Sequence, residues 1–246
     1  MKISIITVVF NAERYIKSCM QSVVNQTYND VEYIIIDGGS TDKTLEIINS
    51  FNGAKFKLIS GKDNGMYDAL NKGIKYATGE VVGFLHADDF YASNTIIEEI
   101  AQFFLKNSSN AIYGDLNYVH PDSFKVIRKW VSNTYSLKNI EQGWMPPHPT
   151  LFLKKQIYIE IGGYSLAYGS AADYEFILRL LYTYKVKADY FPQLIVNMRT
   201  GGMSNANIVS RIKAFYNDYK ALRTHQVPFS FLVVFLKKFK KIVQYF

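Results

Sequence analysis

Apolar runs and amphipathic stretches alternate along the first half of the chain. Five apolar runs have the pattern of buried strands, namely residues 3–9, 31–37, 56–60, 81–85 and 111–114. Four stretches between them carry apolar side chains at helical spacing, namely residues 13–25, 43–51, 66–77 and 94–105. We expect Gly79 to end the third of these helices in a left-handed cap. The alternation predicts an α/β protein with a mostly parallel central sheet covered by helices.

The second half is less regular, and its pattern predicts shorter elements. Two short strands are expected within residues 116–130, and two more within residues 185–196 around Pro192. The proline-rich segment 143–149 cannot be helical. Helical spacing marks four further stretches, namely residues 154–161, 174–184, 206–224 and 229–246. We therefore predict a catalytic-type domain over residues 1–205 and a C-terminal helical extension over residues 206–246.

The composition excludes several classes of protein. With 48% hydrophobic and 20% charged residues, the chain is not disordered. Its single cysteine, Cys19, excludes an internal disulfide and a cysteine zinc cluster, and favours a reducing compartment. The N-terminal residues lack the apolar core of a signal peptide, and no stretch approaches the ~18 apolar residues of a membrane span. We expect a protein on the cytoplasmic side of the membrane.

The positive charge is concentrated at the C-terminus. The chain holds 28 Lys and Arg against 21 Asp and Glu, and residues 210–246 contain eight of these basic side chains but one acidic one. The rest of the chain is therefore neutral. A basic tail favours an anionic surface such as a membrane leaflet, whereas a nucleic-acid binder more often spreads its basic groups over a folded face.

Residues 229–246 have the pattern of an amphipathic helix. One face is apolar and contains Leu232, Phe235, Leu236, Phe239, Ile242, Val243 and Phe246. The other face contains Lys237, Lys238, Lys240 and Lys241. Such a helix is expected to lie in a membrane interface. The alternative is that the apolar face packs on the catalytic domain or on a second subunit of a homo-oligomer.

Polar side chains stand at the ends of four predicted strands. They are Thr7 with Asn11, Asp37, Asp63, and His86 with Asp88 and Asp89. Each has a structural explanation when taken alone, as a turn residue or a helix cap. Ligands of open α/β sheets bind outside the carboxyl ends of the strands, so four such groups on one edge indicate a binding site.

Asp88 and Asp89 are adjacent carboxylates that follow an apolar strand. They repel one another unless a cation or hydrogen-bond donors compensate. Mg²⁺ or Mn²⁺ would do so, bound through one or two carboxylates and the phosphates of a substrate. Capping of the following helix is the alternative role for the pair.

Several motifs occur in an order and spacing that are highly specific. They are Thr7–Asn11, Gln26–Tyr28, Ile36–Thr44, Asp63–Gly73, Gly79 with Phe84–Asp89, Pro147–Phe152, Gly162–Tyr164 and Ala172–Arg179. Over about residues 1–205 the chain resembles the family 2 glycosyltransferases of GT-A fold that build bacterial O-antigen, capsule and exopolysaccharide. The resemblance implies a nucleotide-binding half over about residues 1–115 and an acceptor-binding half over residues 116–205.

The resemblance assigns roles to the residues of the nucleotide-binding half. Asp37 would bind the nucleotide base, normally uracil, in a pocket lined by the region of Thr7. Asp63 and Lys72 would lie along the nucleotide, with Lys72 near the diphosphate. Asp88 would hold the metal ion that bridges the diphosphate. His86 stands where the family usually has Asp or Asn, so its contact with metal or ribose is open, as is any contact of Asp89.

Two further residues are assigned to the acceptor side. Asp173 matches the general base of the family, and it could also cap the helix that follows. Many relatives carry two acidic residues there, whereas Ala172 precedes Asp173 in this chain. The loop that contains His148 would lie beside the acceptor or the donor sugar, although His148 could instead be a satisfied histidine in a proline-rich turn.

The resulting expectation is an inverting transferase that depends on Mn²⁺ or Mg²⁺ and moves one sugar from a nucleotide-diphosphate donor, normally a UDP-sugar. Its acceptor would be a lipid-linked saccharide, and the enzyme would be peripheral on the inner face of the plasma membrane. The Q-x-x-R-W signature of processive synthases is absent. A sugar nucleotidyltransferase is disfavoured because no glycine-rich basic loop follows the first strand. An inactive, membrane-bound nucleotide-sugar-binding partner is disfavoured by the intact Asp37, Asp88 and Asp173.

Overall fold

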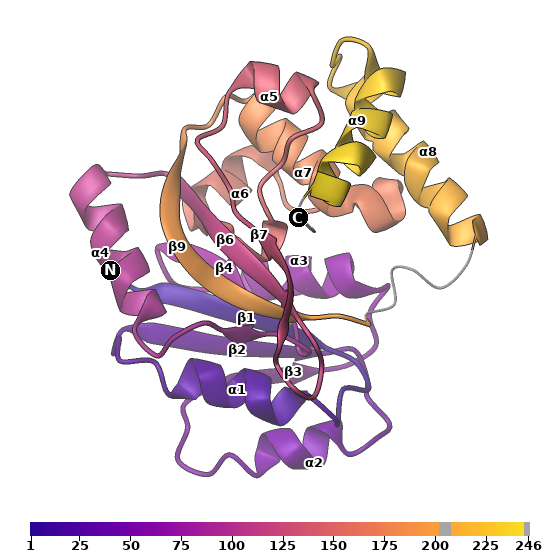
Figure 1. The fold of residues 1–246 in the computed structure, drawn as a ribbon. Helices are drawn as coiled ribbons and strands as arrows, with labels where there is room; N and C mark the ends of the chain where they lie inside the picture. The colour runs from indigo at the N-terminus through magenta and orange to yellow at the C-terminus, as the bar shows by residue number, and fades with distance from the viewer. Residues whose placement is uncertain (202–207, 244–246) are drawn as a thin grey trace.

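The computed structural model describes residues 1–201 and 208–243, and these residues surround a central nine-stranded sheet (Figure 1). Its strands are β1 Ile3–Val9, β2 Val31–Asp37, β3 Lys57–Ser60, β4 Val81–Phe84, β5 Phe90–Tyr91, β6 Ala111–Val119, β7 Val126–Trp130, β8 Phe152–Lys154 and β9 Ala188–Arg199. Their order is β3-β2-β1-β4-β8-β6-β9-β5, and β7 pairs with β6.

The two halves of the sheet differ in strand direction. Strands β3, β2, β1 and β4 are parallel, as expected for strands that alternate with crossover helices. Strand β8 runs antiparallel to both β4 and β6, and β9 is parallel to β6. The predicted α/β class is confirmed, and the second half of the chain adds a mixed region that the apolar pattern did not indicate.

Helices cover both faces of the sheet (Figure 1). They are α1 Ile16–Val24, α2 Thr44–Asn49, α3 Met66–Tyr76, α4 Ile96–Asn107, α5 Leu137–Glu141, α6 Lys155–Ile161, α7 Ala172–Ile177, α8 Ile208–Thr224 and α9 Ser230–Val243. Alternate residues of β1 pack on opposite faces of the sheet, because successive side chains of a strand point to opposite sides. Ile5 joins a buried cluster with Met20 of α1, whereas Ile6 joins another with Leu70 of α3.

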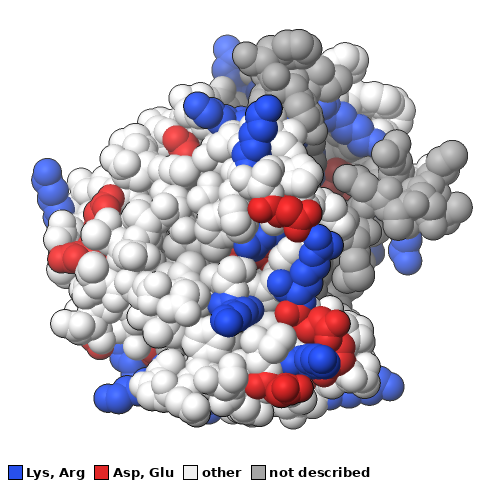
Figure 2. Space-filling view, turned by 60° about the horizontal axis from the view of Figure 1, so that its bottom comes forward, with Lys and Arg blue, Asp and Glu red and all other residues white. Residues whose placement is uncertain are grey.

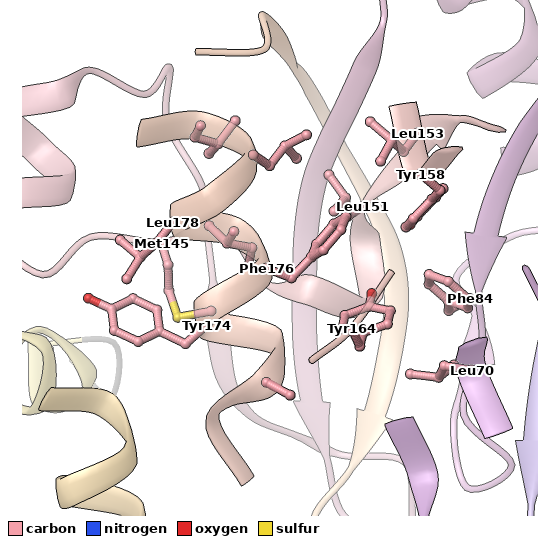
Figure 3. Close-up of a cluster of buried hydrophobic side chains, with 14 of the residues drawn as sticks. Leu70, Phe84, Met145, Leu151, Leu153, Tyr158, Tyr164, Tyr174, Phe176 and Leu178 are labelled. Atoms are coloured by element: carbon pink, nitrogen blue, oxygen red, sulfur yellow. The ribbon is translucent and has the colours of Figure 1, made fainter. Parts of the chain in front are cut away.

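Aromatic rings join α7 to the sheet. Phe176 of α7 lies 5.3 Å from Tyr158 and 4.9 Å from Tyr164 between ring centroids, and Tyr164 meets Phe84 of β4 edge-on at 5.8 Å. Figure 3 shows these four side chains between the ribbon of α7 and the sheet. These rings pack α7 against the end of β4, where the candidate site lies.

The role predicted for Gly79 is wrong. Helix α3 ends at Tyr76, and its C-cap residue Ala77 is extended. Gly79 is not among the described glycines with positive φ. A Cβ atom on Gly79 would instead lie 2.7 Å from the backbone nitrogen of Ser4. Glycine is required here because two backbone segments approach closely.

The prediction of two strands around Pro192 is also wrong. Strand β9 is continuous from Ala188 to Arg199, and Pro192 is exposed within it. The register between β6 and β9 shifts near Asp115, and such an irregularity accommodates a residue that cannot donate to the ladder. The predicted helix 174–184 begins earlier, at Ala172, and continues into a π-helical turn from Leu178 to Thr183.

The described C-terminal helices pack on the rest of the protein. Five side chains of these helices and of the turn between them are buried in the same hydrophobic cluster as α3 and α7, namely Ala221, Leu222, Val227, Val233 and Val234. Figure 1 shows α8 and α9 as an antiparallel pair beside α7. Basic and acidic side chains lie interspersed on the face shown in Figure 2, as the neutral balance of residues 1–209 indicates.

Candidate active site

Asp37 ends β2, and Asp63 follows β3 and lies beside Gly38, the residue after Asp37. The buried Asp37 carboxylate accepts hydrogen bonds from the backbone N–H of Gly39 at 3.1 Å and from the hydroxyl of Ser60 at 2.6 Å. Asp63 accepts one from the Gly65 N–H at 2.8 Å. A Cβ atom on Gly38 would lie 2.6 Å from the other Asp63 oxygen. The two carboxylates therefore shape one corner, with bare glycine backbone between them.

Lys72 binds the loop that contains Asp63. Its ammonium donates to the backbone oxygen of Lys62 at 3.1 Å and lies 3.3 Å from a carboxylate oxygen of Asp68. The side chain is one third exposed, so its charge is screened but remains accessible to an anion.

Thr7 lies inside the core rather than at the edge of the sheet. Its side chain is fully buried, accepts a hydrogen bond from the Tyr33 hydroxyl at 3.1 Å and lies 3.8 Å from the Cys19 sulfur. The reason is that β1 continues to Val9, so Thr7 is two residues short of its end. Phe10, with 61% of its surface exposed, and Asn11, whose side chain accepts from the Thr41 N–H at 2.8 Å, occupy the edge instead.

The two carboxylates after β4 have different surroundings. Asp89 is 1% exposed and accepts a hydrogen bond from the backbone N–H of Arg199 at 3.1 Å, whereas Asp88 keeps partial exposure. Burial raises the pKa of both carboxyl groups, although the Arg199 guanidinium opposes the rise. Asp89 is thus a structural anchor in this arrangement, and Asp88 is the one that retains access to solvent.

Arg199 holds this segment from the opposite end of the chain. Its guanidinium donates to the backbone oxygen of Asp88 and to the Ser18 hydroxyl, the latter at 2.9 Å. The charged group also lies 4.7 Å from the Phe90 ring and 5.0 Å from the Tyr15 ring. Sequence reasoning missed Arg199, because a lone arginine at the end of a strand carries no signal for a partner 111 positions away.

The residues present fit a metal ion whose remaining ligands would come from the substrate. Among the described residues, no group of three or more His, Cys, Asp or Glu side chains could hold a metal. Asp88 offers carboxylate oxygen in a half-buried position, where a cation would offset the raised pKa. Mg²⁺ and Mn²⁺ suit such a site, since Mg²⁺ in particular is usually held by one or two carboxylates together with phosphate oxygens.

His86, His148 and Asp173 form a connected chain of side chains. The Nε2 atoms of His86 and His148 are 3.1 Å apart, and Nδ1 of His148 lies 3.2 Å from Oδ2 of Asp173. The other Asp173 oxygen accepts from the Tyr174 N–H at 2.8 Å. Three segments, after β4, before β8 and at the start of α7, are thereby joined at one place.

The charges of these three connected side chains depend on the surroundings of Asp173. Burial alone would raise the pKa of Asp173, but His148 and the Lys237 ammonium hold it well below its usual range. Burial and the neighbouring His148 lower the pKa of His86 to about 3. At neutral pH the site therefore contains an ionised carboxylate and a neutral His86 imidazole.

The alternative role of Asp173 as a helix cap is wrong. The N-cap of α7 is Ala171, and Asp173 lies in the first turn. Glu175, two residues on, faces elsewhere: its carboxylate binds Arg179 at 2.9 Å and His225 at 3.1 Å. Arg179 also donates to the Gly163 carbonyl at 2.6 Å. Asp173 thus remains the acidic candidate that the sequence indicated at this position. Glu175 instead anchors the end of α8 through His225.

The site can support proton transfer beside an anionic leaving group. Asp173 is an ionised carboxylate with partial access to solvent, since 18% of its side chain is exposed. His86 connects it, through His148, to the segment of Asp88. One carboxylate that could accept a proton and another that could hold a cation, on different segments, match the needs of a displacement at a carbon attached to a phosphate.

Comparison with known proteins identifies related chains. A family model described as Glycosyl transferase family 2 matches residues 4–169. A PGL/p-HBAD biosynthesis glycosyltransferase of Mycobacterium tuberculosis is 30% identical over 207 residues, which is 82% of this chain and 78% of the relative. Chondroitin synthase of Pasteurella multocida is 29% identical over 181 residues, which is 72% of this chain but 18% of that longer protein.

Solved structures share the fold. S. aureus TarS 1–349 in complex with UDP-GlcNAc has a TM-score of 0.70 at 20% identity, covering 94% of this chain and 73% of its own. The mannosyltransferase PcManGT from Pyrobaculum calidifontis, in complex with GDP-Man and Mn²⁺, has a TM-score of 0.66 at 14% identity, covering 97% and 69%.

Proposed function

The chain belongs to glycosyl transferase family 2, and from this premise we propose that it transfers a single sugar from a nucleotide-diphosphate sugar to a saccharide acceptor with inversion at the anomeric carbon. The observation that carries the proposal is the ionised Asp173 carboxylate, joined through His148 and His86 to the segment of Asp88.

Asp173 acts as the general base in this proposal. It takes the proton of the acceptor hydroxyl while that oxygen bonds to the anomeric carbon. The bond from this carbon to the phosphate oxygen breaks, and its electron pair leaves with the nucleoside diphosphate. His148 holds the carboxylate through Nδ1, as orienting groups hold catalytic bases elsewhere. Attack from the side opposite the leaving group inverts the anomeric centre.

Asp88 would hold Mn²⁺ or Mg²⁺ together with the diphosphate oxygens. When bound, the ion supplies charge stabilisation for the departing diphosphate. Lys72 would add a positive charge near the phosphates. Its present contact with the Lys62 carbonyl shows that the side chain reaches the loop beside Asp63.

The corner formed by Asp37, Gly38 and Asp63 would bind the nucleoside. Asp37 is already oriented by the N–H groups of the following turn, but its side chain is fully buried, so contact with a base edge would require this turn to shift. We assign uracil to this corner, and UDP-GlcNAc in the related TarS structure supports that assignment.

The acceptor is proposed to be a lipid-linked saccharide that the enzyme meets at a membrane surface. None of the described helices is both long and apolar enough to span a bilayer. Residues 229–246 provide the attachment through the apolar face that the sequence predicted. Lys237 is buried, whereas Leu232, Phe235, Lys238 and Phe239 are exposed, and the side chains beyond residue 240 lie outside those described.

Two substitutions test the assignment by separating binding from turnover. Asp88→Asn is expected to weaken UDP binding in Mn²⁺ but leave metal-free binding unchanged, as titration calorimetry would measure. Asp173→Asn is expected to retain UDP binding and to lower UDP release from nucleotide sugars at least ~10²-fold, the loss of a general base. The matched control is Asp122→Asn, which removes an exposed carboxylate on the β6–β7 hairpin.

Screening UDP-GlcNAc, other UDP-sugars and GDP-Man for thermal stabilisation in Mn²⁺ selects the donor for these assays. Equal UDP affinity of Asp88→Asn and wild type in Mn²⁺ would remove Asp88 from the metal site. Near-normal UDP release by a folded Asp173→Asn variant would place the base elsewhere.

A further inference from the structure

Helix α9 lies directly on the loop that leads to His148. A Cβ atom on Gly143 would be 2.6 Å from the backbone nitrogen of Lys237 and 2.9 Å from the backbone oxygen of Val233. Gly143 has a φ of 78°, a conformation that favours glycine, so the close approach and the turn both depend on this residue. The loop is thus supported from outside by the backbone of α9, five residues before His148.

The Lys237 side chain contacts the other segment of the site. Its ammonium lies 3.4 Å from the centroid of the Tyr174 ring and 2.9 Å from Oδ1 of Asp218 on α8, and the side chain is 9% exposed. Figure 3 shows the Tyr174 ring extending from α7 on the side of the C-terminal helices. Tyr174 is 1% exposed, and its N–H donates to Asp173 at 2.8 Å.

We propose that Lys237 is a positioning residue of the active site, through which α9 holds Tyr174 and thereby orients the Asp173 carboxylate toward His148. The inference rests on the proposed function in that Asp173 is the base. Nothing in the amphipathic pattern of the helix distinguishes Lys237 from its basic neighbours, since all four lysines fall on one predicted face.

The geometry explains why this lysine and not another takes the role. A buried ammonium needs both a counter-charge and a favourable surface, and a desolvated cation gains from lying over an aromatic face. Asp218 and Tyr174 supply these two features to Lys237. Lys238, the next residue, is exposed and lies 4.7 Å from the Phe215 ring, away from the site.

Lys237 also contributes to the electrostatics of the base. Five titratable groups interact electrostatically with the Asp173 carboxylate. They are His86 and His148 from the loops, Tyr67 from α3, Tyr164, and Lys237 from α9. Of these groups in the described part of the chain, Lys237 alone carries a permanent positive charge. Removing that charge raises the pKa of Asp173, because Lys237 helps to hold it down.

The test compares Lys237→Met with Lys238→Met, a matched substitution one residue away on the exposed side. Lys237→Met keeps the apolar stem and removes the charge. We expect it to lower kcat for UDP release about tenfold or more, as a displaced catalytic group does, with the KM for the nucleotide sugar unchanged. The acid limb of its kcat profile shifts to higher pH. Lys238→Met is expected to behave as wild type in both respects.

Two further variants separate positioning from folding. Lys237→Arg retains a cation over Tyr174 and is expected to recover most of kcat. Asp218→Asn weakens the packing of α9 but leaves the cation in place, so it lowers the melting temperature more than it lowers kcat. The positioning role would be overturned if kcat and the melting temperature of Lys237→Met fall in the same ratio as they do in Asp218→Asn.

A spectroscopic readout does not need the donor or acceptor. The ring resonances of His148, assigned with His148→Gln, report on its contact with Asp173. They are expected to move in Lys237→Met and to stay in place in Lys238→Met. Identical His148 resonances and UDP release in the two methionine variants would refute the inference. If instead Asp173→Asn keeps normal turnover, the proposed base is wrong, and that result is independent of the response of His148 to Lys237.

Discussion

Replacing Arg199 with methionine tests whether the segment of Asp88 and Asp89 after β4 is held in place from β9. The guanidinium donates to the Asp88 carbonyl, to the Ser18 hydroxyl at 2.9 Å and to the Pro121 carbonyl at 3.4 Å. Methionine has a similar stem and keeps the backbone N–H that binds Asp89. The substitution therefore removes the charged head and its hydrogen bonds and leaves the strand pairing intact.

The expected loss of stability follows from these contacts. A hydrogen bond from a charged donor contributes ~1.5–3 kcal/mol, and the long contact with Pro121 counts for little. Asp89 also loses the positive charge that opposes the rise of its pKa. We expect the free energy of unfolding to fall by ~4 kcal/mol. At ~2–4 °C per kcal/mol for a chain of this length, the melting temperature falls by roughly 8–16 °C.

Urea unfolding measures the free energy, and UDP titration in Mn²⁺ measures the effect on the site. UDP affinity is expected to fall in Arg199→Met even at temperatures where the variant is folded, because the backbone at Asp88 is no longer fixed. Arg199→Lys is the matched control: it keeps the charge but cannot reproduce the planar fork, so its stability should be intermediate. A free energy of unfolding within ~1 kcal/mol of wild type would show that Arg199 does not hold this segment.

Two other predictions concern the C-terminal helices. Burial alone would raise the pKa of Glu175, but His225 and Arg179 hold it below its usual range, so this carboxylate stabilises the fold above pH ~4.3 and loses that effect as the pH falls through its lowered pKa. Glu175→Gln should therefore cost ~3 kcal/mol at pH 7 in urea unfolding, and the difference from wild type should shrink in acid; an equal difference at pH 7 and pH 3 would contradict this. Leu232→Ser with Phe239→Ser, at side chains 55% and 65% exposed, should weaken binding to anionic vesicles on the order of 10²-fold without changing the melting temperature. Leu105→Ser, on α4 and 66% exposed, is the control, and vesicle binding that both variants retain would exclude the proposed attachment through this face.

Much of the first half of the fold could be predicted from the sequence. The apolar runs located β1, β2, β3 and β4, because a strand buried on both faces must be apolar along its length. Their parallel order then placed Asp37 and Asp88 on one edge of the sheet. The exception is Thr7. The pattern predicted its strand correctly, but Thr7 lies two residues before the end of that strand and is buried rather than accessible.

The contacts at the site itself came only from the tertiary structure. His86, His148 and Asp173 are separated by 62 and 25 positions, and nothing local in any of the three segments specifies the others. The loop of residues 143–149 and the aromatic packing of α7 bring them together. Arg199 is a similar case, since its partners are decided by where a long strand ends after a shift in register.

Helix α9 shows most clearly which features the sequence determines and which the tertiary structure decides. Its spacing of apolar and basic residues was enough to establish a helix with two faces, because that periodicity belongs to the helix itself. Which side turns inward is a property of the surface it meets. Gly143 admits the helix backbone, and Asp218 and Tyr174 together compensate the burial of one ammonium. Lys237 therefore lies inside while Phe239 lies outside, because the free energy of burying a charge depends on partners supplied by other parts of the fold.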